Sequence, residues 1–193
     1  RLVLSAENTS FHGMGREDID VRCLGRGRPF VLEVKHPRVR RTDLEEVMKV
    51  VNSNGADKIE ISDLRWTNRS EVSRVKETRA EKSYTIRFSV EEQPEESFII
   101  ESISKLSGVT LEQQTPKRVS HRRADLIRKR KVVSIDNVVV EDSEVQFSVR
   151  CEAGTYVKEL VHSDEGRTVP SVAGVLGSPC EVIWLDVEDI HAD

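Results

Sequence analysis

The stretch 132–151, VVSIDNVVVEDSEVQFSVRC, constrains the fold more than any other part of the chain. It holds two strand-like runs, 132–140 and 144–151, that are separated only by EDS, a spacing typical of a β-hairpin. Residues 83–90, SYTIRFSV, alternate apolar and polar side chains and predict another strand, with Tyr84, Ile86, Phe88 and Val90 on one face. A hairpin joins antiparallel strands, so we expect a largely antiparallel sheet.

Helical patterns are interleaved with these strands. Residues 42–55 predict the clearest helix, with Thr42 as its cap, Glu45 closing a capping box and Gly55 at its end. Its apolar stripe consists of Leu44, Val47, Met48 and Val51. Further helices are predicted over 70–77, 95–107, 156–163 and 169–177, and further strands over 57–64 and 180–190. The expected fold is α+β: a mixed, mostly antiparallel sheet flanked by helices, in one domain over residues 1–193.

Composition excludes several classes of protein. The 193 residues are 37% hydrophobic and 33% charged, which favours a folded domain over a disordered chain. No apolar run approaches the roughly 20 residues of a membrane span, and no signal peptide opens the chain. The three cysteines lack a C-x-x-C pair, and the Glu159–His162 spacing occurs once, whereas a di-metal site needs it twice. We expect a monomer without metal or cofactor in the cytoplasm, or in the nucleus if the source is eukaryotic.

The charge is unevenly distributed along the chain. Residues 117–131, KRVSHRRADLIRKRK, contain eight Lys or Arg and one acid, a net charge of +7, so the rest of the chain carries −11 of the total of −4. Such a segment can be a solvated surface, or it can bind a phosphate backbone through its local field. The sequence alone leaves both interpretations open.

Residues 12–22, HGMGREDIDVR, gather two carboxylates between two guanidiniums. If this stretch is extended, Arg16, Asp18, Asp20 and Arg22 lie on one face. They can form ordinary surface ion pairs, or they can hold a reacting carboxylate behind a flexible glycine-rich approach. Spacing does not choose between the two aspartates.

Two further positions carry candidate chemistry. Tyr84 can be a core aromatic residue with its hydroxyl at the rim, or a residue of a site. Tyr156 and Lys158 follow a Gly154-Thr155 turn at a predicted strand-to-helix junction. A lysine in the first turn of a helix faces the positive end of the helix dipole, so Lys158 either has a carboxylate partner or is a surface lysine.

Three stretches together resemble a known family. GREDIDVRCLGRGRPF, QQTPKRVSHRRADLIRKRKV and AGTYVKELVHSDEGRTVPS are similar to signature stretches of the tRNA pseudouridine synthases that act on the TΨC arm in archaea and eukaryotes. That family joins an N-terminal THUMP-containing region to a C-terminal catalytic domain. The chain begins at Arg1 as if within a strand, so we expect a fragment that corresponds to the catalytic domain.

The resemblance implies an RNA-binding cleft at the centre of the fold and a cofactor-free isomerisation of uridine 55, and also of uridine 54. Asp18 falls on the catalytic position of an R-x-D pattern, and Tyr84 on the tyrosine that stacks against the base. Lys158 falls on the basic partner of the aspartate, and Leu160 packs beneath the site. Ser163 and Glu165 depart from the family pattern, which puts local RNA contacts of their loop in doubt.

These implied roles agree with the chemistry of the side chains. A carboxylate beside an anomeric carbon can attack C1′ or stabilise a cationic state there, or it can remove the C2′ proton. A stacked uridine must first be flipped out of the RNA. Further contacts to tRNA are expected from Arg16, Lys117, Arg118, His121, Arg122, Arg123, Tyr156, Arg167 and Arg22. A base-releasing N-glycosylase and a non-catalytic RNA-binding module remain as alternatives.

Overall fold

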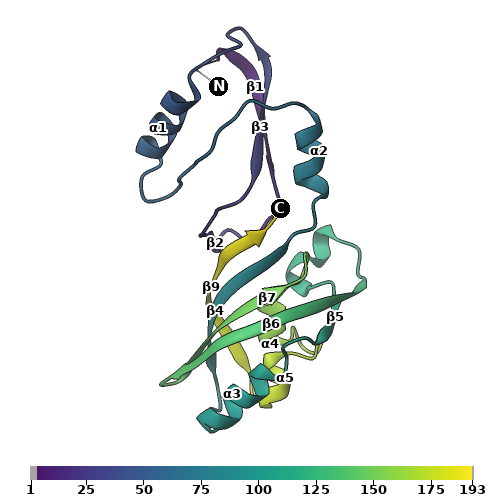
Figure 1. The fold of residues 1–193 in the computed structure, drawn as a ribbon. Helices are drawn as coiled ribbons and strands as arrows, with labels where there is room; N and C mark the ends of the chain where they lie inside the picture. The colour runs from purple at the N-terminus through teal and green to yellow at the C-terminus, as the bar shows by residue number, and fades with distance from the viewer. Residues whose placement is uncertain (1–3, 193) are drawn as a thin grey trace. The chain divides into compact units, whose positions relative to one another are not determined.

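The computed structural model describes residues 4–192, which form two compact units. Of the described residues, the N-terminal unit comprises 4–16 and 29–78, and the C-terminal unit comprises 17–28 and 79–192. Figure 1 shows the elements of each unit. The segment 17–28 therefore belongs to the same unit as the hairpin and the C-terminal strand, although residues 29–78 separate them in sequence.

The N-terminal unit is built on a two-stranded antiparallel sheet. Strands β1 (Ala6–Gly13) and β3 (Phe30–Pro37) pair along their length, and the rings of Phe11 and Phe30 stack at 5.2 Å. Helix α1 spans Leu44–Asn54 and α2 spans Ser70–Glu77. Helix α2 packs on both strands. The predicted helices 42–55 and 70–77 are thus confirmed.

Two details of this unit differ from the expectation. Asp43, not Thr42, caps α1, because its carboxylate accepts from the backbone N–H groups of Glu45 and Glu46. The predicted strand 57–64 is wrong: this segment has no regular secondary structure, and Asn52 holds it by exchanging two hydrogen bonds with the backbone of Ile61. A side-chain amide there takes the place of a strand partner.

The C-terminal unit contains a seven-stranded sheet in the order β2-β9-β4-β7-β6-β5-β8. Its central strands are β4 (Glu81–Val90), β6 (Ile127–Glu141), β7 (Glu144–Cys151) and β9 (Cys180–His191), all antiparallel to their neighbours among these four. The short β2 (Arg22–Cys23) runs parallel to β9. Strands β5 (Thr110–Gln114) and β8 (Thr168–Val169) complete the other edge. The sheet is mixed and mostly antiparallel, as predicted, and the 132–151 hairpin is confirmed.

Within its described residues this unit also contains three α-helices. Helix α3 (Glu96–Ser104) packs on β6, and α4 (Val157–His162) packs on β9 (Figure 1). Helix α5 (Val172–Leu176) contacts both of them. The core lies between these helices and the sheet, where the rings of Phe88 and Phe147 meet edge to face at 5.9 Å. Tyr84, Ile86, Phe88 and Val90 are all buried, which confirms the predicted face of the strand.

The segment 17–28, called here the aspartate loop, is not the extended strand that its alternating charges suggested. Residues 18–21 form a turn in which the Val21 N–H donates to the Asp18 carbonyl at 3.2 Å. After β2, the Leu24 N–H donates to Val187 of β9 at 2.8 Å. Two ion pairs with β9 hold the same half of the loop: Arg22 with Asp186, and Arg26 with Asp189.

A glycine is required where this loop crosses β9. Gly25 has a φ of +58°, and a Cβ at this position would lie 2.0 Å from the carbonyl oxygen of Glu188. Gly27 has a similar φ of +72° but no neighbour within 4 Å of its would-be Cβ. Substituting each glycine by alanine therefore distinguishes the free-energy cost of a left-handed backbone from the cost of a steric clash.

We predict that Gly25→Ala destabilises the protein more than Gly27→Ala. Gly27→Ala should cost about 1–2 kcal/mol for the left-handed backbone, and Gly25→Ala should cost a further 1–3 kcal/mol, roughly, because the backbone of β9 must shift. Urea unfolding of both variants measures the difference. Equal losses would mean that the loop does not need its close approach to β9.

Candidate active site

Asp18 lies in a network of charged side chains that come from three separate segments of the C-terminal unit. Its carboxylate receives Arg118 Nη1 at 2.7 Å, and Lys158 Nζ lies 3.8 Å from its Oδ2. Arg118 belongs to a short 3-10 helix, η1 (Lys117–Arg122), and Lys158 belongs to α4. Two cations therefore hold the Asp18 carboxylate. Its side chain is 30% exposed, so solvent can still reach it.

Arg118 is fixed from its other side by a buried carboxylate. Glu159 is 1% exposed, and its two oxygens accept from Arg118 Nε at 2.6 Å and Nη2 at 3.3 Å. Burial lowers the pKa of Arg118, but the hydrogen bond to Glu159 and the nearby Asp18 outweigh it and raise the pKa above its ordinary value. The guanidinium stays charged and joins the buried Glu159 to the exposed Asp18.

Lys158 makes its shortest contact with the second aspartate. Its Nζ lies 2.7 Å from Asp20 Oδ2, and this hydrogen bond lowers the pKa of Asp20. The expectation that Lys158 has a carboxylate partner is met, but by Asp20 first and Asp18 second. Arg22 holds Asp186 of β9 through Nε at 3.0 and 3.1 Å, because its strand lies beside β9.

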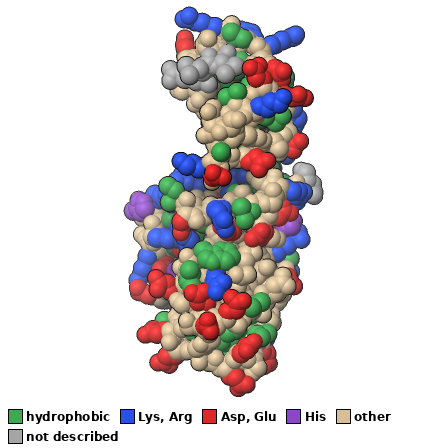
Figure 2. Space-filling view, turned by 90° about the vertical axis from the view of Figure 1, so that its left-hand side faces the viewer, with side chains coloured by type: hydrophobic (Ala, Val, Ile, Leu, Met, Phe, Trp, Pro, Cys, Tyr) green, Lys and Arg blue, Asp and Glu red, His purple; other side chains and the backbone are tan. Residues whose placement is uncertain are grey.

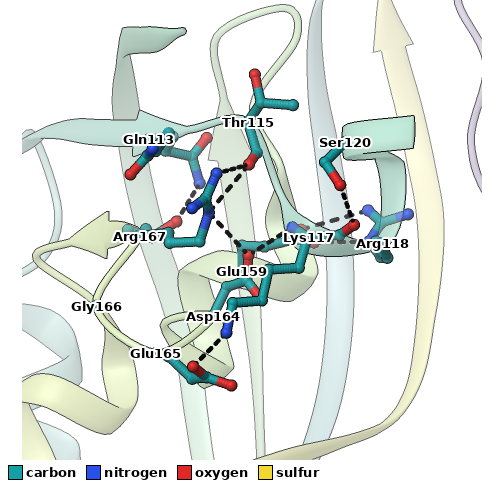
Figure 3. Close-up of polar contacts among 12 residues, drawn as sticks. Gln113, Thr115, Lys117, Arg118, Ser120, Glu159, Asp164, Glu165, Gly166 and Arg167 are labelled. Carbon is teal, nitrogen blue, oxygen red and sulfur yellow. Dashed lines mark hydrogen bonds and ion pairs between the residues drawn. The ribbon is translucent and has the colours of Figure 1, made fainter. Parts of the chain in front are cut away.

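The loop after α4 fixes the start of η1. Residues 163–166 all have positive φ values, an uncommon run that turns the chain sharply. The Asp164 carboxylate accepts the backbone N–H of Lys117 at 2.9 Å, and Glu165 pairs with the Lys117 ammonium (Figure 3). Ser163 and Glu165, which depart from the family pattern, thus belong to a loop that orders the helix carrying Arg118.

A buried glutamine positions the start of α4. Gln113 is fully buried on β5, and its side-chain amide exchanges hydrogen bonds with the backbone N–H and carbonyl of Tyr156, both at 2.9 Å. The Tyr156 hydroxyl accepts from Arg123 at 3.2 Å. The start of α4, the helix that carries Lys158 and Glu159, is therefore fixed relative to β5.

The other predicted residues fall in different surroundings. Tyr84 is 6% exposed on β4, and burial raises the pKa of its hydroxyl, so it is uncharged at neutral pH. Leu160 is completely buried on α4. Arg167 donates to the Thr115 carbonyl at 2.7 Å (Figure 3). It also pairs with Asp125. Arg16 falls in the other unit, and His121 and Arg122 are exposed on η1.

Positive charge is less concentrated in space than in the sequence. On the face shown in Figure 2, Lys and Arg side chains of the C-terminal unit are interspersed with Asp and Glu. Within segment 117–131, Lys117, Arg118 and Lys129 pair with carboxylates. Among the described residues, no group of three or more His, Cys, Asp or Glu could hold a metal ion, and no helix is long and apolar enough to span a membrane.

Sequence reasoning missed the roles of Gln113 and Glu159 and assigned Arg118 only to RNA. Glu159 carried a usable signal: it stands between Val157 and Leu160 in a short helix whose other residues are mostly apolar, and a buried acid needs a cation. Nothing in the sequence indicated that the cation would come from residue 118.

We predict that loss of Arg118 lowers the free energy of unfolding only while Glu159 is present. Arg118→Met leaves a buried carboxylate without its cation and should cost about 3 kcal/mol, near the lower end of the usual range because Arg118 is partly exposed. Arg118→Met combined with Glu159→Met removes both charges and should recover most of that loss. Urea unfolding of the single and double variants tests this; a double variant as unstable as Arg118→Met alone would contradict it.

The comparisons with known proteins show which family the chain belongs to. The family described as "Pus10, C-terminal" matches residues 2–191. The tRNA pseudouridine synthase Pus10 of Methanothrix thermoacetophila is 48% identical over 96% of this chain and 41% of its own length. That of Thermofilum pendens is 41% identical over 98% of this chain and 43% of its own length. The chain spans less than half the length of these relatives.

Solved structures show a related fold. A chain of a Cbf5-Nop10-Gar1 complex superposes with a TM-score of 0.59 at 22% identity, over 98% of this chain and 42% of that chain. A chain of an H/ACA RNP bound to a substrate RNA containing 2′-deoxyuridine superposes with a TM-score of 0.51 at 19% identity, over 96% of this chain and 39% of that chain. At these identities the likeness is one of fold, whereas the match over residues 2–191 shows that the chain belongs to the Pus10 family, in its C-terminal part.

Proposed function

We propose that this chain is the catalytic part of a tRNA pseudouridine synthase, an isomerase that converts uridine to pseudouridine at position 55 of the TΨC loop, and also at position 54. Membership of the Pus10 family supports the reaction class. The observation that carries the site is the Asp18 carboxylate, partly exposed and approached by Arg118 and Lys158 from two different elements.

In this reaction the bond between N1 of uracil and C1′ of its ribose breaks, the uracil turns, and a new bond forms between C5 and C1′. C5 then loses its proton and N1 gains one, so the proton count is unchanged. Substrate and product are isomers, so no oxidant or reductant is consumed. Asp18 either attacks C1′ or removes the C2′ proton, and both roles require an ionised carboxylate. Arg118 Nη1 and Lys158 Nζ place positive charge 2.7 and 3.8 Å from that carboxylate.

Arg118 and Lys158 each make their shortest contact in the aspartate loop with a different aspartate. Arg118 is anchored by Glu159 and places its outer nitrogen on Asp18, while Lys158 holds Asp20 at 2.7 Å. Asp20 thereby keeps the turn closed around Asp18 and needs no contact with the ribose. This gives the two carboxylates different roles, which spacing alone left open.

Tyr84 is proposed as the platform for the flipped base. Tyr84 is 6% exposed, so a uracil can contact only the small part of this residue that the unit leaves uncovered. Base–aromatic stacking contributes about 1–3 kcal/mol and tolerates any base. The uncharged hydroxyl leaves the ring a neutral stacking surface.

The direct test is incubation of the protein with an unmodified tRNA transcript, followed by mapping of pseudouridine at each uridine. Pseudouridine in the TΨC loop is the expected result. Free uracil would instead identify an N-glycosylase, and bound but unchanged tRNA would identify a binding module.

We predict that Asp18→Asn abolishes pseudouridine formation and leaves tRNA affinity and the thermal midpoint nearly unchanged, because it removes charge and keeps shape. The assay is single-turnover tritium release from C5-labelled tRNA, with binding and melting measured on the same preparation. A well-folded Asp18→Asn variant that still releases tritium would remove Asp18 from the chemistry.

Asp20→Asn serves as the matched variant and should retain measurable turnover. Its side chain is 65% exposed, so the loss of its ion pair should cost less than about 1 kcal/mol. The pKa of Asp20 is lowered on folding, so its stabilising effect is present above the ordinary value of 3.8 and is lost as pH falls through the folded pKa. The stability difference from wild type should therefore shrink in acid.

For Tyr84 we predict different outcomes for Phe and Leu. Tyr84→Phe keeps the ring and should retain the fold and most of the RNA affinity. Tyr84→Leu keeps much of the buried volume but loses the stacking face, so turnover should fall far more than stability; Ala would confuse the two by opening a cavity. Single-turnover rates and melting curves separate the effects, and a Leu variant with full turnover would disprove the platform role.

A further inference from the structure

A second ion cluster lies beside the candidate site and is less exposed than the first. Glu17, the residue before Asp18, pairs with Lys82 at 2.5 Å and with Arg28. The side chains are largely buried: Glu17 is 11% exposed, Lys82 12% and Arg28 17%. All three belong to the C-terminal unit. Neither the sequence patterns nor the proposed chemistry uses them.

A contribution to folding stability does not explain why these three charged side chains are largely buried. Charged groups lose solvation when they are buried, and apolar side chains of similar volume are often equally stabilising or better. Burial and the neighbouring Arg28 lower the pKa of Lys82 to about 8. What an ion cluster does provide is a defined register between the segments that it joins.

The segments joined here carry the two principal residues of the site. Glu17 is bonded directly to Asp18, and Lys82 precedes Tyr84 by two residues, on the same face of β4. The contacts of Arg22, Gly25 and Arg26 hold the far half of the aspartate loop on β9. The Glu17–Lys82 pair instead ties the near end of the loop to β4.

We propose that Glu17 is a positioning residue, which through Lys82 and Arg28 sets the place of Asp18 relative to Tyr84. This inference rests on the proposed function. A displacement of about 1 Å between a reacting group and its substrate can slow a reaction about 100-fold. Glu17 therefore acts on the rate of the chemical step and contributes little to RNA affinity.

The experiment uses the protein that contains this chain and measures kcat, KM and the thermal midpoint on an unmodified tRNA transcript. The triple variant Glu17→Leu/Arg28→Met/Lys82→Met replaces the cluster by apolar side chains. It should melt near or above wild type, with kcat reduced about 10- to 100-fold and KM little changed. Lys82→Arg keeps the charge and should retain most of the turnover.

Glu17→Asp is a milder variant in case the triple variant does not fold. It keeps the carboxylate but shortens the side chain by one methylene, so it should lower kcat while the melting temperature stays close to that of wild type. The matched control is Arg87→Met. Arg87 lies on β4, as Lys82 does, and pairs with Glu144 of β7, so this variant breaks an ion pair of β4 away from the cluster and should leave kcat unchanged.

Wild-type kcat in a folded triple variant, or in Glu17→Asp, would overturn the inference. So would an equal loss in Arg87→Met, since the effect would then come from any disturbance of β4. Failure of the proposed function is recognised separately, because wild-type protein would then form no pseudouridine at all.

Discussion

The buried carboxylate of Glu159 is the constraint on which the site depends. A carboxylate at 1% exposure requires a cation, and Arg118 supplies it through two nitrogens. The remaining nitrogen, Nη1, is then left at a fixed place, and it meets Asp18. A charge that the fold needs for its own stability thus also orients a carboxylate that can perform chemistry. The same helix α4 supplies Lys158, so both cations near Asp18 depend on how α4 is held.

Several parts of the unit converge on α4 and η1. Gln113 of β5 fixes the backbone just before α4, and the left-handed run 163–166 follows it and accepts the first N–H of η1 through Asp164. The sheet edge formed by β5 and β8 therefore does more than close the core. It sets the distance between two short helices, neither of which could keep a stable position alone, because isolated helices of this length are marginal.

The sequence predicted the parts of this unit that local patterning determines. The β4 face and the hairpin followed from period-two alternation and a three-residue connection. The roles of Asp18, Tyr84 and Lys158 were inferred from the family resemblance and stay predictions. The errors have physical causes. Residues 57–64 alternate like a strand but are held by the Asn52 side chain, and the aspartate loop turns at 18–21 because its charges pair with three different elements. Pairings across about 100 residues, such as Arg118 with Asp18, leave no local signal.

The same pairing changes how the basic segment should be understood. In sequence, segment 117–131 carries a net charge of +7. In the structure, Lys117 pairs with Glu165 and Lys129 pairs with Glu112. Arg118 pairs with both Asp18 and Glu159. A cation already neutralised by a carboxylate releases no counterion when a phosphate approaches, so it adds little to salt-dependent RNA binding. The positive charge available to a phosphate backbone is then that of exposed residues such as Arg122, whereas Arg118 orders the candidate site. Thus one segment can both order a candidate site and present positive charge at the surface, and ion pairing decides which residue does which.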